Sequence, residues 1–107
     1  MKNTQLLLIN DMCGYGKVAL SAMLPVLSHM GYRIHNLQTA LVSDTLNYPK
    51  FYIHDTTEYV RQSLAIWEEL GFEFDAISTG FIVTEEETRI ISDFCHRRAQ
   101  KGTKVFV

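Results

Sequence analysis

The sequence predicts one α/β domain of 107 residues with three layers, in which helices cover both faces of a mostly parallel sheet. Short apolar runs, typical of strands buried on both faces, alternate along the chain with longer stretches whose apolar residues recur at helical spacing. A glycine follows each longer stretch, at Gly31, Gly71 and Gly102, where it can end a helix in a left-handed conformation. Such alternation is typical of βαβ units with right-handed crossovers.

The first strand is expected at residues 5–10, where four consecutive aliphatic residues stand between Gln5 and Asn10. Residues 11–16 contain two glycines and are expected to form a loop. From Lys17 onward the apolar period is that of a helix, with Pro25 inside it as the expected site of a bend.

A second strand is predicted over residues 32–42, and a polar and aromatic connector over residues 43–54. The next helix follows Asp55-x-x-Glu58, a weak form of the capping box. One face of that helix carries four apolar residues, which are Val60, Leu64, Trp67 and Leu70.

A third strand is expected over residues 74–78, and a third helix after the full capping box Thr84-x-x-Glu87. Its buried stripe is predicted to consist of Ile90, Ile91, Phe94 and Cys95. Residues 103–107 then form a fourth strand. Because helices normally cover both faces of a parallel sheet, and none follows this strand, we expect the domain to be truncated here.

Composition argues against several functions. A net charge of −2 gives no basic footprint for nucleic acid. The longest apolar run, residues 6–9, is far shorter than a membrane span, and polar residues 2–4 do not open a signal peptide. Cys13, Cys95 and the four histidines have no metal-ligand spacing. We therefore expect a cytoplasmic protein with no metal site and neither nucleic acid nor membrane as partner.

Ligands of open parallel sheets bind at the carboxyl ends of the strands, which makes residues 11–16, 43–48 and 78–81 the candidate segments. The first is neither a Walker loop nor a dinucleotide fingerprint, because Ala19 stands where the third glycine belongs. Asp11 either caps a turn or bonds a hydroxyl or ring substituent of a small ligand, and its spacing alone favours the cap. The polar cluster of Thr39, Ser43, Asp44 and Thr45 fits loop chemistry as well as substrate contact.

Three segments resemble the pyridoxal kinases, in the order in which that family has them. They are I-N-D-M-C-G-Y-G-K-V-A-L-S-A-M-L-P-V-L-S-H-M-G at residues 9–31, L-Q-T-A-L-V-S at 37–43, and W-E-E-L-G-F-E-F-D-A-I-S-T-G-F at 67–81. The resemblance implies a ribokinase-like fold and ATP-dependent phosphorylation of the 5′-hydroxyl of pyridoxal, pyridoxamine or pyridoxine, in vitamin B6 salvage. It also implies ATP and Mg²⁺ as cofactors of the full-length enzyme, neither expected to bind tightly to this chain.

The resemblance assigns substrate-binding roles to five residues, which are Asp11, Val18, Ser43, Thr45 and Phe81. Asp11 matches the polar residue placed against the pyridine ring, and Val18 an apolar pocket position. Ser43 matches the serine of the family's S-x-H-T-G loop, in which Thr45 and Leu46 replace the histidine and threonine. Phe81 replaces a frequent tyrosine.

The resemblance assigns no catalytic residue to this chain. In the family the anion hole, the catalytic aspartate and the nucleotide site follow the fourth strand. Residues 1–107 are thus expected to be an incomplete N-terminal part of a kinase domain, inactive alone and homo-oligomeric through its uncovered fourth strand. The alternatives are a hydroxymethylpyrimidine kinase and a non-catalytic α/β binding domain; a receiver is disfavoured because residues 78–80 contain no acceptor aspartate.

Overall fold

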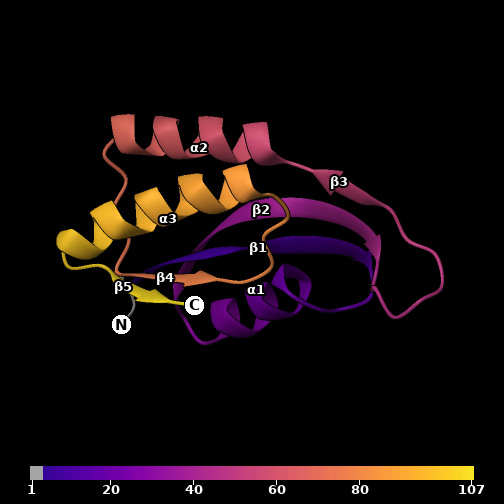
Figure 1. Cartoon of the computed structure of the whole chain (residues 1–107). Helices are drawn as coiled ribbons and strands as arrows, with labels where there is room; N and C mark the ends of the chain where they lie inside the picture. Colours follow the sequence, from indigo (N-terminus) through magenta and orange to yellow (C-terminus); the bar gives the residue numbers. More distant parts are fainter. Residues whose placement is uncertain (1–3) are drawn as a thin grey trace.

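The computed structural model describes residues 4–107. Five strands form one sheet in the order β3-β2-β1-β4-β5. In Figure 1, α1 lies on one face of the sheet while α2 and α3 lie on the other, so the three-layer α/β architecture is confirmed. The elements are β1 (Gln5–Tyr15), α1 (Leu20–His29), β2 (Arg33–Asp44), β3 (Ile53–Asp55), α2 (Thr57–Glu69), β4 (Ala76–Thr79), α3 (Glu85–Gln100) and β5 (Lys104–Phe106).

The sheet is mostly parallel, as predicted. β1 pairs in parallel with β2 on one side and with β4 on the other, and β4 pairs in parallel with β5. β3 pairs antiparallel with β2, and two of its three residues lie in the segment 43–54 that was expected to be a connector, so the sequence missed it. Its three residues gain a strand conformation only from pairing with β2, a contact that no local pattern encodes.

β1 and β2 are longer than expected, and the loop predicted at residues 11–16 is wrong. The two strands stay paired to their ends, where Cys13 lies opposite Val42 and Tyr15 opposite Asp44. This pairing satisfies backbone groups in the glycine-containing end of β1, and it overrides the tendency of glycine to leave a strand.

The helix that follows β1 begins at Leu20, later than the expected Lys17. Gly16 has a φ of 113° and Ala19 a φ of 50°, so the chain between them cannot continue as a right-handed helix. Pro25 lies inside α1 as predicted, and Gly31 follows its end with a left-handed φ of 95°.

The two predicted capping boxes differ in outcome. Thr84 accepts a hydrogen bond from the Glu87 backbone N–H at 3.0 Å, which confirms Thr84 as the N-cap of α3. The weaker box at Asp55 is wrong, because α2 begins at Thr57 and the Asp55 carboxylate accepts from the Thr57 N–H at 2.7 Å instead. Hydrogen bonds from the Thr57 hydroxyl and from the Thr57 N–H lower the pKa of Asp55.

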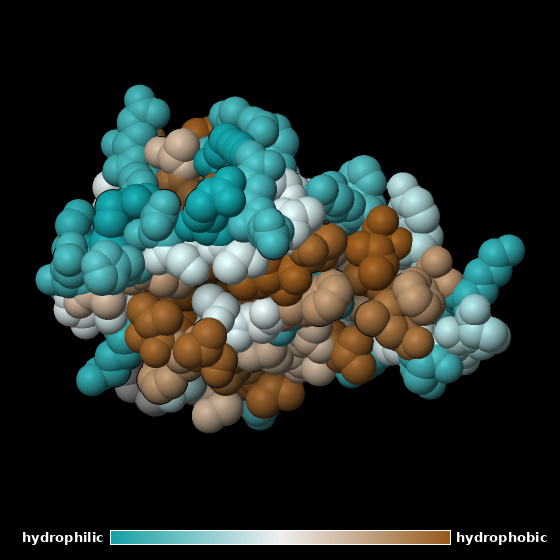
Figure 2. Space-filling model, in the orientation of Figure 1, coloured by the Kyte–Doolittle hydropathy of each residue, from teal (hydrophilic) through white to brown (hydrophobic). Residues whose placement is uncertain are grey.

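The main core lies between the sheet and the pair α2 and α3. Its buried residues are Leu7, Ile9, Leu37, Val60, Leu64, Phe74, Ile77, Ile91, Phe94 and Cys95. Figure 2 shows the matching outer pattern, with hydrophilic surface over these two helices and apolar surface below them. Leu70, predicted to line the buried face of α2, is instead 61% exposed.

Arg98, in the last turn of α3, is buried. Its guanidinium lies 5.2 Å from the centre of the Phe94 ring, a cation–π contact. Its neighbour Arg97 does face outward and joins α3 to α2 through two hydrogen bonds to Glu68 at 3.0 and 3.1 Å.

Candidate functional site

The carboxyl ends of β1, β2 and β4 point to the same side of the sheet, because the three strands are parallel. All five residues suggested by the sequence lie in the carboxyl-terminal part of these strands or just beyond it. Asp11 and Ser43 lie within β1 and β2, Thr45 follows β2, and Phe81 follows β4. Val18 lies in the turn between β1 and α1, with its side chain 44% exposed.

Asp11 and Phe81 form the first group, and a third residue links them. The side-chain oxygen Oδ1 of Asn10 accepts hydrogen bonds from the backbone N–H of Asp11 and from that of Phe81, both at 2.9 Å. Thr39 approaches from β2, and its hydroxyl donates to the Phe81 carbonyl at 2.5 Å. Both backbone groups of Phe81 are therefore held by side chains of neighbouring strands.

The carboxyl group of Asp11 is half-buried, and this burial raises its pKa; a hydrogen bond from its own backbone N–H opposes the effect. Removal from water makes a carboxylate a stronger partner for a hydroxyl or a protonated ring nitrogen, because competition from solvent falls. Asp11 can therefore bind the polar edge of a small aromatic ligand.

Ser43 and Thr45 form the second group, at the far end of β2. The Ser43 hydroxyl donates to the Asp44 carboxylate at 2.5 Å and accepts from the Tyr52 N–H at 2.7 Å. The Thr45 N–H donates to the Tyr15 carbonyl at 3.1 Å. A shallow hollow of about 510 Å³ opens beside this group, lined by Tyr15, Ser43, Asp44, Tyr48, Pro49 and Lys50.

The two groups are separate along the sheet. A Cβ added to Gly14 would lie 3.0 Å from the Ser43 carbonyl oxygen, which places Ser43 beside Gly14. Gly14 is three residues beyond Asp11, or roughly 10 Å along an extended strand. A ligand of vitamer size would have to reach across this distance to touch both groups.

Sequence reasoning did not single out Asn10 as a site residue. The signal available was a polar side chain at the end of a buried apolar run, directly before Asp11. Thr39 belonged to the polar cluster noted at the second strand, and its complete burial distinguishes it from a loop residue.

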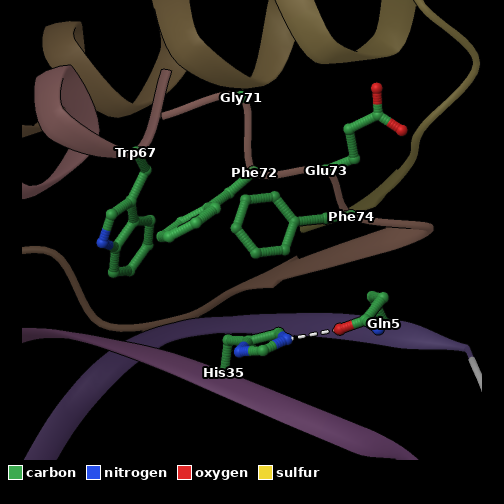
Figure 3. A pocket seen from close by; sticks show the side chains of 7 residues that line it. All are labelled: Gln5, His35, Trp67, Gly71, Phe72, Glu73 and Phe74. Carbon is green, nitrogen blue, oxygen red and sulfur yellow. Dashed lines mark hydrogen bonds between the residues drawn. The ribbon is translucent and has the colours of Figure 1, made fainter. Parts of the chain in front are cut away.

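A larger cavity lies at the opposite end of the sheet, beside the amino ends of β1 and β2. It measures about 580 Å³ and is lined by Gln5, His35, Trp67, Gly71, Phe72, Glu73 and Phe74. In Figure 3 the three aromatic rings of α2 and the following loop stand over His35 and Gln5, while the Glu73 carboxylate points away from them. Ligands of open α/β sheets bind at the carboxyl ends, so this cavity is not the candidate site.

Within residues 4–107, no cluster of three or more histidine, cysteine, aspartate or glutamate side chains is arranged to hold a metal ion. In the same range, no helix combines the length and apolar character needed to cross a membrane.

Comparison with protein-family models gives no match for this chain, and comparison with curated protein sequences gives none either. Solved structures do match. A protein from Bacteroides thetaiotaomicron described as a phosphomethylpyrimidine kinase, crystallised with pyridoxal, is 32% identical, with a TM-score of 0.90 over 96% of this chain and 36% of its own. Pyridoxal kinase from Lactobacillus plantarum is 26% identical, with a TM-score of 0.82 over 88% of this chain and 34% of its own.

More distant kinases share the fold. Pyridoxal kinase from Leishmania donovani, solved with ADP and pyridoxine, is 20% identical, with a TM-score of 0.76 over 94% of this chain and 37% of its own. The chain spans a little over a third of the length of these solved kinases. It therefore has the ribokinase-like α/β fold of the pyridoxal kinases, and almost all of its own length is similar to part of such a kinase.

Proposed function

We propose that residues 1–107 form the N-terminal, substrate-binding part of an ATP-dependent kinase that phosphorylates the 5′-hydroxyl of pyridoxal, pyridoxamine or pyridoxine. Asp11 and Phe81 contact the pyridine ring of the substrate, and Val18 forms an apolar side of the pocket. Ser43 and Thr45 bind the far edge of the substrate. The nucleotide, Mg²⁺ and the groups that transfer the phosphoryl belong to sequence beyond this part. The complete enzyme would serve vitamin B6 salvage in the cytoplasm.

One observation carries the proposal: this chain is 32% identical, over 96% of its length, to a protein that is described as a phosphomethylpyrimidine kinase and was crystallised with pyridoxal. The site adds chemical support. The backbone N–H groups of the half-buried Asp11 and the partly exposed Phe81 both donate to the Asn10 side chain, at the carboxyl end of the sheet. A carboxyl group and an aromatic ring on two backbone segments that are joined in this way suit a hydroxylated pyridine.

The second candidate is a kinase acting on a hydroxymethylpyrimidine. The same relative favours it, because that protein is described as a phosphomethylpyrimidine kinase. A pyrimidine also presents a flat ring with polar substituents, so Asp11 and Phe81 alone do not separate the two substrates. A non-catalytic binding domain is a third candidate, but the kinase relatives offer it no support.

Ligand titration tests the proposal. We expect pyridoxine, which lacks the aldehyde that reacts with lysines, to shift the NMR amide signals of Asp11, Phe81 and Ser43, and to bind more tightly than hydroxymethylpyrimidine. The chain alone should not consume ATP. Shifts confined to the aromatic cavity near Trp67, or tighter binding of the pyrimidine, would refute the proposal.

A pair of aspartate variants makes the test specific. Asp11→Asn keeps the shape of the side chain and should weaken pyridoxine binding about tenfold, since a hydrogen bond to a charged group contributes about 1.5 kcal/mol or more. Asp75→Asn is the matched control. Asp75 lies at the amino end of β4, where its carboxylate accepts from the Gln5 N–H at 2.7 Å, and its replacement should leave binding unchanged.

A further inference from the structure

The pairing of β1 with β2 shifts register at the first group of site residues. Asn10 lies opposite Gln38 and Met12 opposite Leu41, so Asp11 alone faces both Thr39 and Ala40. This is a β-bulge in β2, a feature that disrupts the ladder locally and can re-aim a side chain toward a site. The bulge leaves backbone groups near Asp11 without ladder partners, and side chains must satisfy them.

One atom of Asn10 binds the N–H next to the bulge and a second N–H from outside the β1–β2 ladder. Its Oδ1 accepts from the N–H of Asp11 in β1 and from the N–H of Phe81 after β4. Since both partners are donors, the oxygen must face them, and the amide nitrogen then faces Gly80. The Asn10 side chain thus fastens two site residues from two strands to each other.

Gly80 has no side chain at the place where Asn10 needs room. A Cβ at this position would overlap the Asn10 side-chain amide. The Gly80 N–H also donates to the Ile9 carbonyl at 2.8 Å, which holds its backbone against β1. An alanine here could be accommodated only if the Asn10 amide moved and released both of its hydrogen bonds.

Thr39, a residue of the bulge in β2, also binds the Phe81 backbone. It is fully buried, and its hydroxyl donates to the Phe81 carbonyl at 2.5 Å. With the N–H of Phe81 held by Asn10 and the carbonyl held by Thr39, rotation of the Phe81 backbone is restricted at both ends. The direction in which the Phe81 ring leaves the backbone is thereby fixed.

We propose that Asn10 and Thr39 are positioning residues that lock the Phe81 backbone and the Asp11 amide in the geometry that binds the ligand ring. Neither needs to touch the ligand, because each acts through the residue that it holds. This inference rests on the proposed function, which supplies the ligand. The Asn10–Gly80 contact makes the lock intolerant of any side chain at residue 80.

Amide hydrogen exchange and pyridoxine titration test the lock on the same samples. Thr39→Val keeps the shape and removes the hydroxyl; we expect faster exchange of the Phe81 amide and a Kd for pyridoxine about tenfold higher. Thr39→Ser keeps the hydroxyl and should restore both readouts. Thr103→Val is the control, because the Thr103 hydroxyl makes the same kind of bond, to the Phe74 carbonyl at 2.8 Å, at the opposite end of the sheet.

A double-mutant cycle tests the Asn10–Gly80 contact. Gly80→Ala should raise the Kd about tenfold in the native background, but less than twofold when Asn10→Ala has already removed the amide. Equal effects in both backgrounds would overturn the role of Asn10. An unchanged Kd in Thr39→Val, despite faster exchange at Phe81, would overturn positioning by Thr39.

Failure of the lock and failure of the proposed function give different results. If the native chain does not bind pyridoxine, the proposed function is wrong and the lock has no ligand to serve, whatever the exchange data show. If the native chain binds and the variants bind equally well, the proposed function stands and the lock is refuted. Urea unfolding of each variant identifies any that do not fold; if Thr39→Val is one of them, the double-mutant cycle of Asn10 and Gly80 decides instead.

Discussion

Glu87 carries a carboxyl group into the interior at the first turn of α3. The side chain is fully buried; its Oε1 accepts from the Val83 N–H at 2.9 Å, and among the described residues its Oε2 has no hydrogen-bond partner. Burial raises the pKa of Glu87, and the negative charge of Asp55 raises it further. The folded protein therefore holds the Glu87 proton more tightly than the unfolded chain does.

This difference predicts how stability changes with pH at Glu87. Below about pH 4.3, the ordinary glutamate pKa, the group is protonated in both states. As the pH rises, the unfolded chain loses the proton first, so the contribution of Glu87 to stability falls until the pH passes the raised native pKa. Because glutamine does not titrate, the free energy of unfolding of Glu87→Gln should rise relative to that of the native protein across this range.

Urea unfolding between pH 4 and 8 measures this difference. Glu85→Gln, an exposed change in the same helical turn, should show no such trend. A constant gap between Glu87→Gln and the native protein at all pH values would contradict the raised pKa.

At the candidate site, the sequence predicted that the candidate residues lie at the carboxyl ends of strands, but not the hydrogen bonds that join them. Residues at the carboxyl ends of strands could be identified because the parallel arrangement follows from the alternation of strand and helix. The hydrogen bonds of Asn10 and Thr39 depend on a register shift between β1 and β2 and on the close approach of Gly80. Neither feature has a local pattern, since both arise from strands distant in sequence.

Among the elements, the start of α3 was predicted correctly, whereas the end of β1 was not. The start of α3 depends on Thr84 and Glu87, which are neighbours in sequence, so a local rule was sufficient. The end of β1 depends on its pairing with β2, from Cys13 to Tyr15, and a glycine-based loop prediction could not foresee it. β3 was missed for the same reason.

The N-cap of α3 leads to a prediction about stability. Besides accepting from Glu87, the Thr84 hydroxyl lies 3.0 Å from that of Thr57 at the start of α2, so it joins the two helices. Thr84→Ala should lower the free energy of unfolding by about 1–2 kcal/mol. Thr84→Ser keeps the hydroxyl and should recover most of this loss.

Arg89→Ala is the control for the cap, because Arg89 is exposed within α3 and alanine favours helix. It should leave stability unchanged or raise it slightly. Urea unfolding at pH 7 compares the variants. A Thr84→Ser protein as unstable as Thr84→Ala would show that the hydroxyl does not provide the cap.

At the scale of the whole molecule, β5 combines an exposed strand edge with exposed apolar side chains. This strand pairs with β4 on one side, and within residues 4–107 no strand lies along its other edge. Phe106 is 56% exposed and Val107 fully exposed. Beside them an apolar groove of about 420 Å³ runs between α3 and the sheet, lined by Thr79, Ile82, Thr88, Ile91, Ser92, Cys95, His96, Ala99, Val105 and Val107. Figure 2 shows apolar surface in this region, near the C-terminus.

Parallel sheets are normally covered on both faces, and unpaired strand edges pair readily with other chains. We therefore predict that the 107-residue chain forms a dimer or larger assembly through β5 and the adjoining groove. A specific interface buries about 800 Å² per partner. Light scattering at increasing concentration should show the assembly, and Phe106→Lys should weaken it at least tenfold, because burying a phenylalanine contributes about 1.5–3 kcal/mol.

Leu70→Lys is the matched control, since Leu70 is also an exposed apolar side chain, at 61%, but lies at the end of α2. It should leave the assembly intact, because the predicted interface does not include α2. Amide exchange supplies a second measurement: strand pairing would slow exchange of the outward N–H groups of β5 on assembly. A native chain that stays monomeric at high concentration would contradict the prediction, as would an assembly that Leu70→Lys disrupts and Phe106→Lys does not.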